Sequence, residues 1–321
     1  MHWALKGVCL AAALAILGPG YPALGQDLIK VKIGRLAFPS LSTIMNDVVK
    51  ARGLDKKHGI ELEPVSQSQI SAYYGALASG EVDMTASGPL VVQKMILEGV
   101  KLRIGLTWAQ MKILSVVTNN PAIKSITDLK GKTIAATMGS SEYQTLAVYG
   151  RTQGLVFGKD ITVINASPPL AISQLQAKRV EASLLWEPST TIVMQKNPDV
   201  RVILEGDKAW SAIAKTTGWD LVLAIREDFL NTKAQAIPRL EAMFQEAQKW
   251  CRDNPDECDK ILVGTIKMPP GALKAALTSG RLAYDIKVAA KEEDAIWNMF
   301  KVAVDAGYLP KLPDRSVIYK P

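Results

Sequence analysis

The chain has few residues that carry nucleophilic or metal chemistry. It contains 2 histidines and 3 cysteines among 321 residues, and His2 and Cys9 lie near its start. With His58 as the one remaining histidine, and with no Cys or His cluster at zinc spacing, a Ser-His-Asp hydrolase and a zinc centre are both disfavoured. The sequence has no nucleophile-elbow, dinucleotide-binding or phosphate-loop motif at a turn between a predicted strand and helix, where these motifs function. We therefore expect no catalytic residues, no metal and no cofactor.

Long apolar runs and blocks of like charge are also missing. Beyond residue 25 no apolar run reaches the 18 or so residues of a transmembrane helix. The 38 Lys and Arg exceed the 31 Asp and Glu, for a net charge of +7, but basic and acidic residues are interleaved. Because no basic stripe carries interleaved aromatics, we expect no nucleic-acid partner, and the positive balance weakly favours an anionic ligand.

Residues 1–25 have the pattern of a secretory signal peptide. Lys6 is their only charged residue, residues 7–17 are apolar, and Gly18-Pro19-Gly20 ends that segment. Ala23 and Gly25 are small residues at the recognition positions, which predicts cleavage before Gln26. The mature chain would then have about 296 residues and a net charge of +6, since it loses Lys6. We expect an exported, periplasmic protein.

Strand-like and helix-like segments alternate through the first two thirds of the chain, and the length exceeds one ordinary core. We predict an α/β fold of two lobes with a hinge of two chain crossovers. Lobe 1 would comprise residues 27–115 and 223–321, and lobe 2 residues 116–222. From residue 226 to 307 the sequence is mostly helical, and residues 309–321 form an extended tail. The predicted strands are residues 31–37, 60–65, 83–87, 102–108, 114–118, 133–137, 161–165, 182–186, 200–204 and 220–225; the predicted helices before residue 226 are 41–51, 72–78, 90–97, 142–152 and 170–177.

Small or polar residues follow most of these strands. In open α/β sheets, ligands bind beyond the carboxyl ends of the strands, so we expect the site in these loops. Gly139-Ser140-Ser141 is the strongest candidate, because a strand stops there before a helix. Free backbone N–H groups, two hydroxyls and the positive end of a helix dipole would cradle an anionic or polar ligand; simple N-capping is the alternative. The candidate ligand-binding residues are Phe38, Ser40, Ser68, Gln69, Ser87, Gly88, Trp108, Gly139, Ser140, Ser141, Pro168, Trp186 and Glu187.

Several of these candidates have an alternative structural role. Ser87-Gly88-Pro89 could face the cleft from lobe 1 or cap a helix. Trp108 and Trp186 end strands, where each could form a stacking wall or pack beneath a loop. Glu187 could accept hydrogen bonds from an amine, which would disfavour a bare nitrate, or could cap the next helix. Phe38, Tyr73 and Tyr143 are weaker aromatic candidates.

Two further features stay open at this stage. Arg35 lies on the first strand, and alternation leaves undecided whether it points toward the cleft or the outer surface. Cys251 and Cys258 bracket a helix–turn–helix corner and would form a disulfide in an oxidising compartment, or remain two independent thiols.

Spread along the mature chain are motifs that resemble the substrate-binding proteins of ABC importers for nitrate, sulfonate and taurine, which also include binders of thiamine-pyrimidine precursors. The order and spacing of the motifs carry the resemblance over nearly all of the mature chain. The matching stretches are residues 53–54 (Gly-Leu), 57–62 (Lys-His-Gly-Ile-Glu-Leu), 77–84 (Leu-Ala-Ser-Gly-Glu-Val-Asp-Met), 128–134 (Asp-Leu-Lys-Gly-Lys-Thr-Ile), 180–182 (Val-Glu-Ala) and 186–188 (Trp-Glu-Pro).

The resemblance implies the two-lobe periplasmic-binding-protein fold of type II. It implies a monomer that holds a small-molecule ligand between its lobes and delivers it to the transmembrane permease subunits of an importer with a cytoplasmic ATPase. The cargo would be a small anionic or polar solute such as a sulfonate, taurine or nitrate. Alternatives are a thiamine-pyrimidine precursor or an aromatic carboxylate, a sensory role, and an enzyme on the same fold. The related pyrimidine-forming enzymes use His and Cys groups that this chain lacks.

Overall fold

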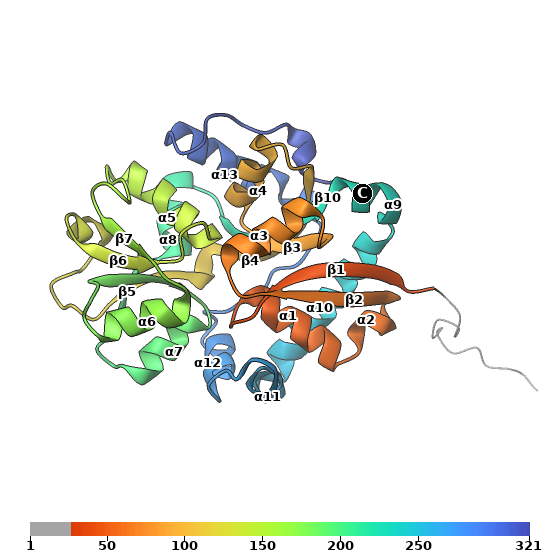
Figure 1. The fold of residues 1–321 in the computed structure, drawn as a ribbon, viewed down its shortest axis with the longest axis horizontal. Coiled ribbons are helices and arrows are strands. Elements are labelled where there is room, and N and C mark those ends of the chain that lie inside the picture. Colours follow the sequence, from red (N-terminus) through yellow and green to blue (C-terminus); the bar gives the residue numbers. More distant parts are fainter. Residues whose placement is uncertain (1–26) are drawn as a thin grey trace, which may run out of the picture.

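A computed structural model of the protein describes residues 27–321. The predicted signal peptide therefore lies outside the described residues. Within them the chain forms two five-stranded sheets, each with helices on both faces (Figure 1). We call the part around the first sheet lobe 1 and the part around the second sheet lobe 2. This arrangement confirms the predicted α/β fold with two lobes.

The sheet of lobe 1 has the strand order β2-β1-β3-β10-β4. Strands β1, β2 and β3 are parallel, while β10 runs antiparallel to both β3 and β4. The antiparallel strand returns from lobe 2, so the sheet is completed by a segment far away in the sequence. The strands are β1 (Ile29–Leu36), β2 (Ile60–Gln67), β3 (Met84–Ser87), β4 (Leu102–Gln110) and β10 (Trp219–Arg226), and the helices between them are α1 (Leu41–Ala51), α2 (Leu54–Lys57), α3 (Ile70–Ser79) and α4 (Pro89–Leu97).

The sheet of lobe 2 repeats this pattern with the order β7-β6-β8-β5-β9. Strand β6 is parallel to β7 and β8, and β5, which arrives from lobe 1, is antiparallel to β8 and β9. The strands are β5 (Leu114–Thr118), β6 (Thr133–Ala136), β7 (Thr162–Asn165), β8 (Ala182–Trp186) and β9 (Arg201–Glu205), and the helices are α5 (Ser141–Thr152), α6 (Pro168–Gln176), α7 (Ser189–Lys196) and α8 (Gly206–Ala214). Neither α7 nor α8 was predicted as a helix.

The chain passes between the lobes twice. The first passage is the 3-10 turn η1 (Met111–Ile113), and the second follows α8. The predicted lobe boundaries at residues 115/116 and 222/223 fall inside β5 and β10, so the sheets divide the chain a few residues earlier at each passage. Both predicted boundaries lie within continuous apolar segments, where hydropathy gives no sign of a change of sheet.

The C-terminal third is helical, as predicted, and most of it packs on lobe 1 (Figure 1). A disulfide joins Cys251 of α10 to Cys258 of α11. In the tail, Ile318 forms a bridge to Ile104 of β4. The helices are α9 (Glu227–Lys233), α10 (Ala236–Asp253), α11 (Pro255–Ile266), α12 (Ala272–Thr278) and α13 (Glu293–Asp305), with the short 3-10 turns η2 (Ile126–Leu129), η3 (Ala289–Glu292) and η4 (Arg315–Val317).

Apolar side chains fill both faces of each sheet. In lobe 1 one cluster lies between the sheet and α1, α10, α11 and α12, and a second lies on the face covered by α3, α4 and α13. Val148 of α5 and Trp210 of α8 belong to the second cluster although they come from lobe 2. The lobes therefore share part of a hydrophobic core, which fixes how the start of α5 approaches lobe 1.

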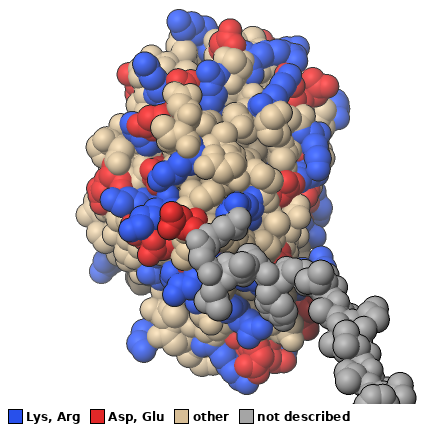
Figure 2. Space-filling model, turned by 90° about the vertical axis from the view of Figure 1, so that its right-hand side faces the viewer, with Lys and Arg blue, Asp and Glu red and all other residues tan. Residues whose placement is uncertain are grey.

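The surface carries mixed charge. On the face shown in Figure 2, Lys and Arg are interspersed with Asp and Glu and form no continuous basic band. None of the helices in residues 27–321 combines the length and the apolar character that crossing a membrane requires.

Candidate functional site

Two neighbouring cavities lie between the lobes. The inner cavity has a volume of about 30 Å³, and Ser42 and Tyr74 of lobe 1 line it together with Ser141 and Trp186 of lobe 2. The outer cavity has a volume of about 410 Å³ and shares Ile70 with the inner one. Because the inner cavity has room for only about two water molecules, the lobes are closed upon each other.

The start of α1 forms the lobe 1 wall of the inner cavity. Ser40 is the N-cap of this helix, and its hydroxyl accepts a hydrogen bond from the Thr43 N–H at 3.2 Å. The Ser42 hydroxyl lies 3.0 Å from the Ser40 hydroxyl. The positive end of an 11-residue helix thus meets the cavity together with two hydroxyl groups, an arrangement that favours an anionic or polar ligand group.

The start of α5 forms the opposite wall. Gly139 has φ = 87°, a left-handed conformation that glycine adopts without strain, so the chain turns sharply from β6 into the helix. The Ser140 hydroxyl accepts a hydrogen bond from the Tyr143 N–H at 3.2 Å, which makes Ser140 the N-cap. Ser141 lines the inner cavity. The two serines therefore have different roles, one capping the helix and the other facing lobe 1.

The two lobes touch at Ser141. Its hydroxyl lies 3.3 Å from the Tyr74 hydroxyl of α3. A Cβ added to Gly88 would lie 2.6 Å from the Ser141 Cβ and 3.2 Å from the Asp220 carbonyl oxygen. Only glycine at residue 88 allows this approach, so Gly88 contributes to the site through its small size.

The end of β8 supplies an aromatic wall. Trp186 lines the inner cavity, and its ring centroid lies 6.4 Å from that of Phe38, across the lobe interface. The next residue, Glu187, is buried, and its Oε2 accepts a hydrogen bond from the Thr191 N–H at 3.2 Å. Its Oε1 meets no donor from residues 27–321. Burial raises the pKa of Glu187, since the charged carboxylate has lost most of its hydration.

A second pair of carboxyl groups is buried where the lobes meet. Glu142, at the start of α5, faces Asp220 of β10. Both residues are at most 6 % exposed. Burial raises the pKa of both carboxyls, and the negative charge of Glu142 raises that of Asp220 further. In the described part of the chain, no Lys or Arg lines either cavity. Among the described residues, the lining of the two cavities therefore includes one acidic side chain, Glu142, and no basic one.

The outer cavity is the mouth of the interface. Ser68, Gln69 and Phe38 of lobe 1 line it opposite Met138 and Leu170 of lobe 2. Met138 and Leu170 are 45 % and 46 % exposed, which is high for large apolar side chains. The mouth thus combines hydroxyl and amide groups on one side with apolar surface on the other.

Seven predicted residues line neither cavity: Gly88, Ser140 and Glu187, described above, and Ser87, Trp108, Gly139 and Pro168. Trp108 is fully buried in lobe 1, where its ring packs 4.7 Å from that of Phe244, because this position on β4 faces α10. Ser87 is buried at the end of β3, and its hydroxyl bonds to that of Thr85. Pro168 is the buried first residue of α6, while its neighbour Ser167 lines the mouth. Gly139 supplies the turn before α5.

The sequence left open whether Arg35 points toward the cleft or the outer surface, and its interaction partners decide this. Its guanidinium pairs with Asp47 of α1 at 2.8 Å and donates a hydrogen bond to Ser66 at 2.9 Å. Arg35 lines neither cavity. It therefore ties β1 to its neighbours and is not available to bind a ligand in this arrangement.

Residue-level prediction missed Ser42, Tyr74, Glu142 and Asp220. For two of them the sequence holds a feature that could have identified them. Asp220 is the one charged residue before Arg226 in an otherwise apolar strand, and Glu142 directly follows the Gly-Ser-Ser turn. Ser42 and Tyr74 lie within ordinary helical sequence, where nothing in the local pattern marks a cavity-lining position.

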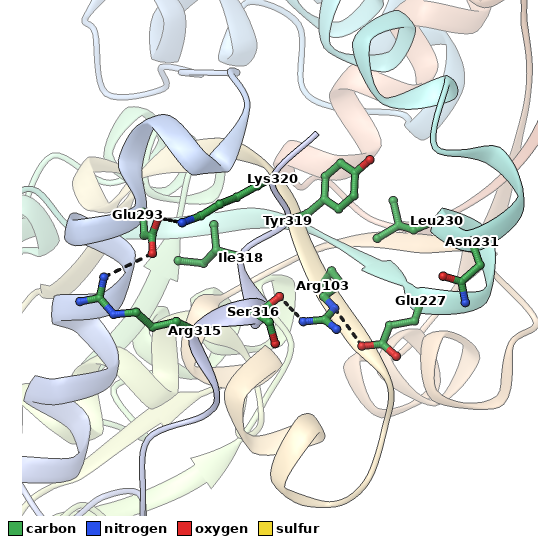
Figure 3. Close-up of a pocket in the computed structure, with 10 residues that line it drawn as sticks. All are labelled: Arg103, Glu227, Leu230, Asn231, Glu293, Arg315, Ser316, Ile318, Tyr319 and Lys320. Carbon is green, nitrogen blue, oxygen red and sulfur yellow. Dashed lines mark hydrogen bonds and ion pairs between the residues drawn. The ribbon is translucent and has the colours of Figure 1, made fainter.

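A separate surface cavity of about 660 Å³ lies on lobe 1 alone (Figure 3). Its charged side chains are engaged with one another, as Arg103 pairs with Glu227 at 2.8 Å and Lys320 with Glu293 at 2.7 Å. The first pair joins β4 to α9, and the second joins the C-terminal tail to α13. Since their charges are already compensated, the cavity is a weaker candidate for ligand binding than the lobe interface.

Metal binding finds no support in residues 27–321, where no three His, Cys, Asp or Glu side chains are grouped to hold an ion.

Comparison with known proteins gives the same fold and a family. The family described as NMT1/THI5 like matches residues 47–258. An aliphatic sulfonates-binding protein of Bacillus subtilis (strain 168) is 25% identical over 315 residues, which cover 94% of this chain and 91% of the relative. The alkanesulfonate-binding protein SsuA of Xanthomonas axonopodis pv. citri, bound to MOPS, has a TM-score of 0.73 at 18% identity, covering 92% of this chain and 98% of its own. The periplasmic aliphatic sulphonate binding protein SsuA of Escherichia coli has a TM-score of 0.70 at 22% identity, covering 91% and 92%.

Proposed function

Because the chain belongs to the NMT1/THI5-like family, we propose that it is a solute-binding protein that captures a small polar solute between its two lobes and delivers it to an ABC permease. The similar proteins named above are binding proteins, which supports a role in capture rather than catalysis. The similarity to a periplasmic protein supports export, in keeping with the predicted signal peptide at residues 1–25.

One observation carries the proposal. The N-termini of α1 and α5, from opposite lobes, meet around the inner cavity with the hydroxyls of Ser42, Tyr74 and Ser141. A solute held there contacts both lobes at once. Charge-assisted hydrogen bonds from such groups each contribute roughly 1.5–3 kcal/mol, so a small oxyanion with several oxygens would gain appreciable affinity. A sulfonate is the first candidate, given the names of the similar proteins.

A specific observation favours a second candidate. The buried carboxyls of Glu142 and Glu187 accept hydrogen bonds and disfavour a solute that carries only negative charge. A solute with N–H donors, such as an aminopyrimidine, would suit them better. The thiamine-pyrimidine class therefore stays in the proposal beside sulfonates.

Closure about the two passages between lobes is the proposed mechanism. A cavity of about 30 Å³ is far smaller than the roughly 300–1,000 Å³ of typical ligand sites, so a solute enters only when the lobes separate. The solute contacts both lobes in the closed form alone, and its differential affinity stabilises that form.

A thermal-shift screen tests the function directly. Sulfonates, nitrate, aromatic carboxylates and pyrimidines are added to the mature protein, and a bound solute must raise Tm, because it binds the folded state. Small-angle scattering with the responding solute should then show compaction. Chemical conversion of that solute by the purified protein, or a Tm that no class of solute changes, would contradict the proposal.

A further inference from the structure

Asp220 occupies an unusual place in the sheet of lobe 1. It lies between Trp219 and Leu221, where the pairing of β10 with β4 shifts register. Such bulges turn side chains away from the regular alternation and are common beside functional sites. Asp220 is 1 % exposed, and neither of its carboxylate oxygens meets a hydrogen-bond donor from the described residues. An ionised carboxylate in this position is strongly disfavoured, because it has lost its hydration and gains no donor or positive charge in exchange.

The group that faces Asp220 is another acid, and it comes from the other lobe. The carboxyl of Glu142 is within hydrogen-bonding reach of the Asp220 carboxyl. The lobes also approach closely beside this pair, where Gly88 lies against the Ser141 side chain and the Asp220 carbonyl oxygen. Two carboxylates repel each other, but a carboxylic acid and a carboxylate form a strong hydrogen bond.

The surroundings supply no compensating charge. The titratable groups near the pair are the hydroxyls of Tyr73 and Tyr74 on α3, and burial raises the pKa of both. The remaining polar neighbours are the hydroxyl of Ser140 and the N–H of Glu142 itself. Since no basic side chain contributes to this cluster among residues 27–321, a proton is the only positive charge that the protein itself can place between the two acids.

We propose that Glu142 and Asp220 form a proton-dependent latch between the lobes, so that closure takes up one proton, which the two carboxyls share. The latch rests on the hinge closure of the proposed function. It adds a dependence on pH that the capture of a solute by hydroxyls and helix N-termini does not require.

The direction of this dependence follows from linkage. In an open form both carboxyls face water and ionise at about pH 4. In the closed form their pKa values are raised, so the closed form binds more protons than the open form above about pH 4. Closure is therefore favoured in acid and is lost as the pH rises through the raised pKa. Where the difference is one proton, the ratio of closed to open molecules falls about tenfold for each pH unit.

The test measures the distance between the lobes without any solute. Spin labels are attached to cysteines introduced by Ser71→Cys and Met138→Cys, exposed positions on opposite walls of the mouth. Pulsed electron resonance then gives the distance distribution from about pH 5 to about pH 8.5. In the labelled protein that keeps both Glu142 and Asp220, we expect mainly the short distance between labels at low pH. A long-distance population should grow as the pH rises.

Two variants assign the effect to the pair. In Asp220→Asn and in Glu142→Gln an amide replaces one acid and donates a permanent hydrogen bond to the other, so each variant should keep the short distance at every pH. Glu205→Gln, which removes a carboxylate on the surface of lobe 2, should retain the pH dependence. If Asp220→Asn does not fold, Glu142→Gln decides alone.

Two results would overturn the latch. The first is a distance distribution that does not change with pH in the labelled protein with both Glu142 and Asp220. The second is the same pH-dependent change of distance in Glu142→Gln and Asp220→Asn. Because no solute is present, these results leave the proposed function standing. Conversely, pH-dependent closure with no Tm response to any solute would retain the latch and remove the proposed function.

Discussion

The two lobes have the same strand order, but the helices that follow their first parallel strands make different contacts. In each, the first parallel strand leads into a helix capped by a serine, Ser40 before α1 and Ser140 before α5. The start of α1 bonds mostly within lobe 1, where the Thr43 hydroxyl donates to the Leu36 carbonyl at 2.7 Å. The start of α5 instead packs against lobe 1, with Ser141 against Gly88 and Glu142 against Asp220.

This difference shows that the N-cap of a helix and the contact of that helix with the other lobe depend on different residues. In either lobe, the N-cap serine accepts a hydrogen bond from a free N–H group of the first helical turn. The residues next to the cap determine which groups the end of the helix contacts. In lobe 2 these residues reach across the interface, so changes at the start of α5 should alter closure, while the matching changes at α1 should alter mainly the stability of lobe 1.

The largest expected effect compares the two tryptophans that were predicted at strand ends. Trp108 lies in the core of lobe 1, so Trp108→Ala should lower the free energy of unfolding by roughly 3–5 kcal/mol, measured by urea denaturation. Trp186→Phe should cost less stability and weaken binding of the solute that responds in the thermal-shift screen. Unchanged solute affinity in Trp186→Phe, measured by calorimetry, would remove Trp186 from the site.

Gly88→Ala tests the close contact between lobes. The added Cβ would lie 2.6 Å from the Ser141 Cβ, and overpacking of this kind costs roughly 1–3 kcal/mol. If the strain is relieved by opening, the affinity for the solute should fall roughly 10- to 100-fold. Adding Ser141→Gly, which removes the facing Cβ, should restore part of the lost stability, measured as Tm without solute. A lack of rescue would place the strain within lobe 1, at the Asp220 carbonyl.

The two N-caps should give matched effects on stability. Ser40→Ala and Ser140→Ala each remove one hydrogen bond to a free N–H group and should each cost about 1 kcal/mol. Ser141→Ala leaves the cap intact, so it should lower solute affinity with little change in Tm. Replacing both Ser140 and Ser141 should weaken binding about tenfold, and an unchanged Kd would exclude both serines from the site.

The smallest effect concerns Glu187, whose pKa is raised by burial. A carboxyl with a raised pKa in the folded state stabilises the fold in acid, and this contribution is lost as the pH rises through that pKa. Glu187→Gln keeps an oxygen for the Thr191 N–H and carries no charge. The variant should therefore have a higher Tm than the parent at about pH 8, and the difference should vanish at about pH 4. A difference independent of pH would mean that the effect is one of packing.

Much of the fold was predictable because its periodic signals are local. The helix at residues 41–51 and the strands at 114–118 and 182–186 were predicted at their observed bounds. Each has a local signal, which is helical spacing of apolar residues in the helix and a short, mostly apolar run in the two strands. Helices α7 and α8 were missed, because Pro188 and the mixed polar residues after β8 and β9 hide their periodicity.

The site was less predictable because burial and facing are not local. Of the predicted residues, the cavities are lined by Phe38, Ser40, Ser68, Gln69, Ser141 and Trp186. Trp108 and Ser87 follow the same sequence rule and face the interior of lobe 1 instead. On a strand, one residue of register moves a side chain to the other face, and the sequence alone does not reveal this register.

The sequence by itself determined the two-lobe α/β architecture, the Gly-Ser-Ser turn and the resemblance to solute-binding proteins, because each depends on hydrophobic period, turn chemistry or short motifs. Only the tertiary structure decided that Ser140 caps while Ser141 touches Tyr74, and that Glu142 meets Asp220 about 78 positions away in the chain. Contacts between lobes depend on where a bulge turns one side chain and where a glycine lets two backbones approach. These are properties of two surfaces together, and neither segment encodes them alone.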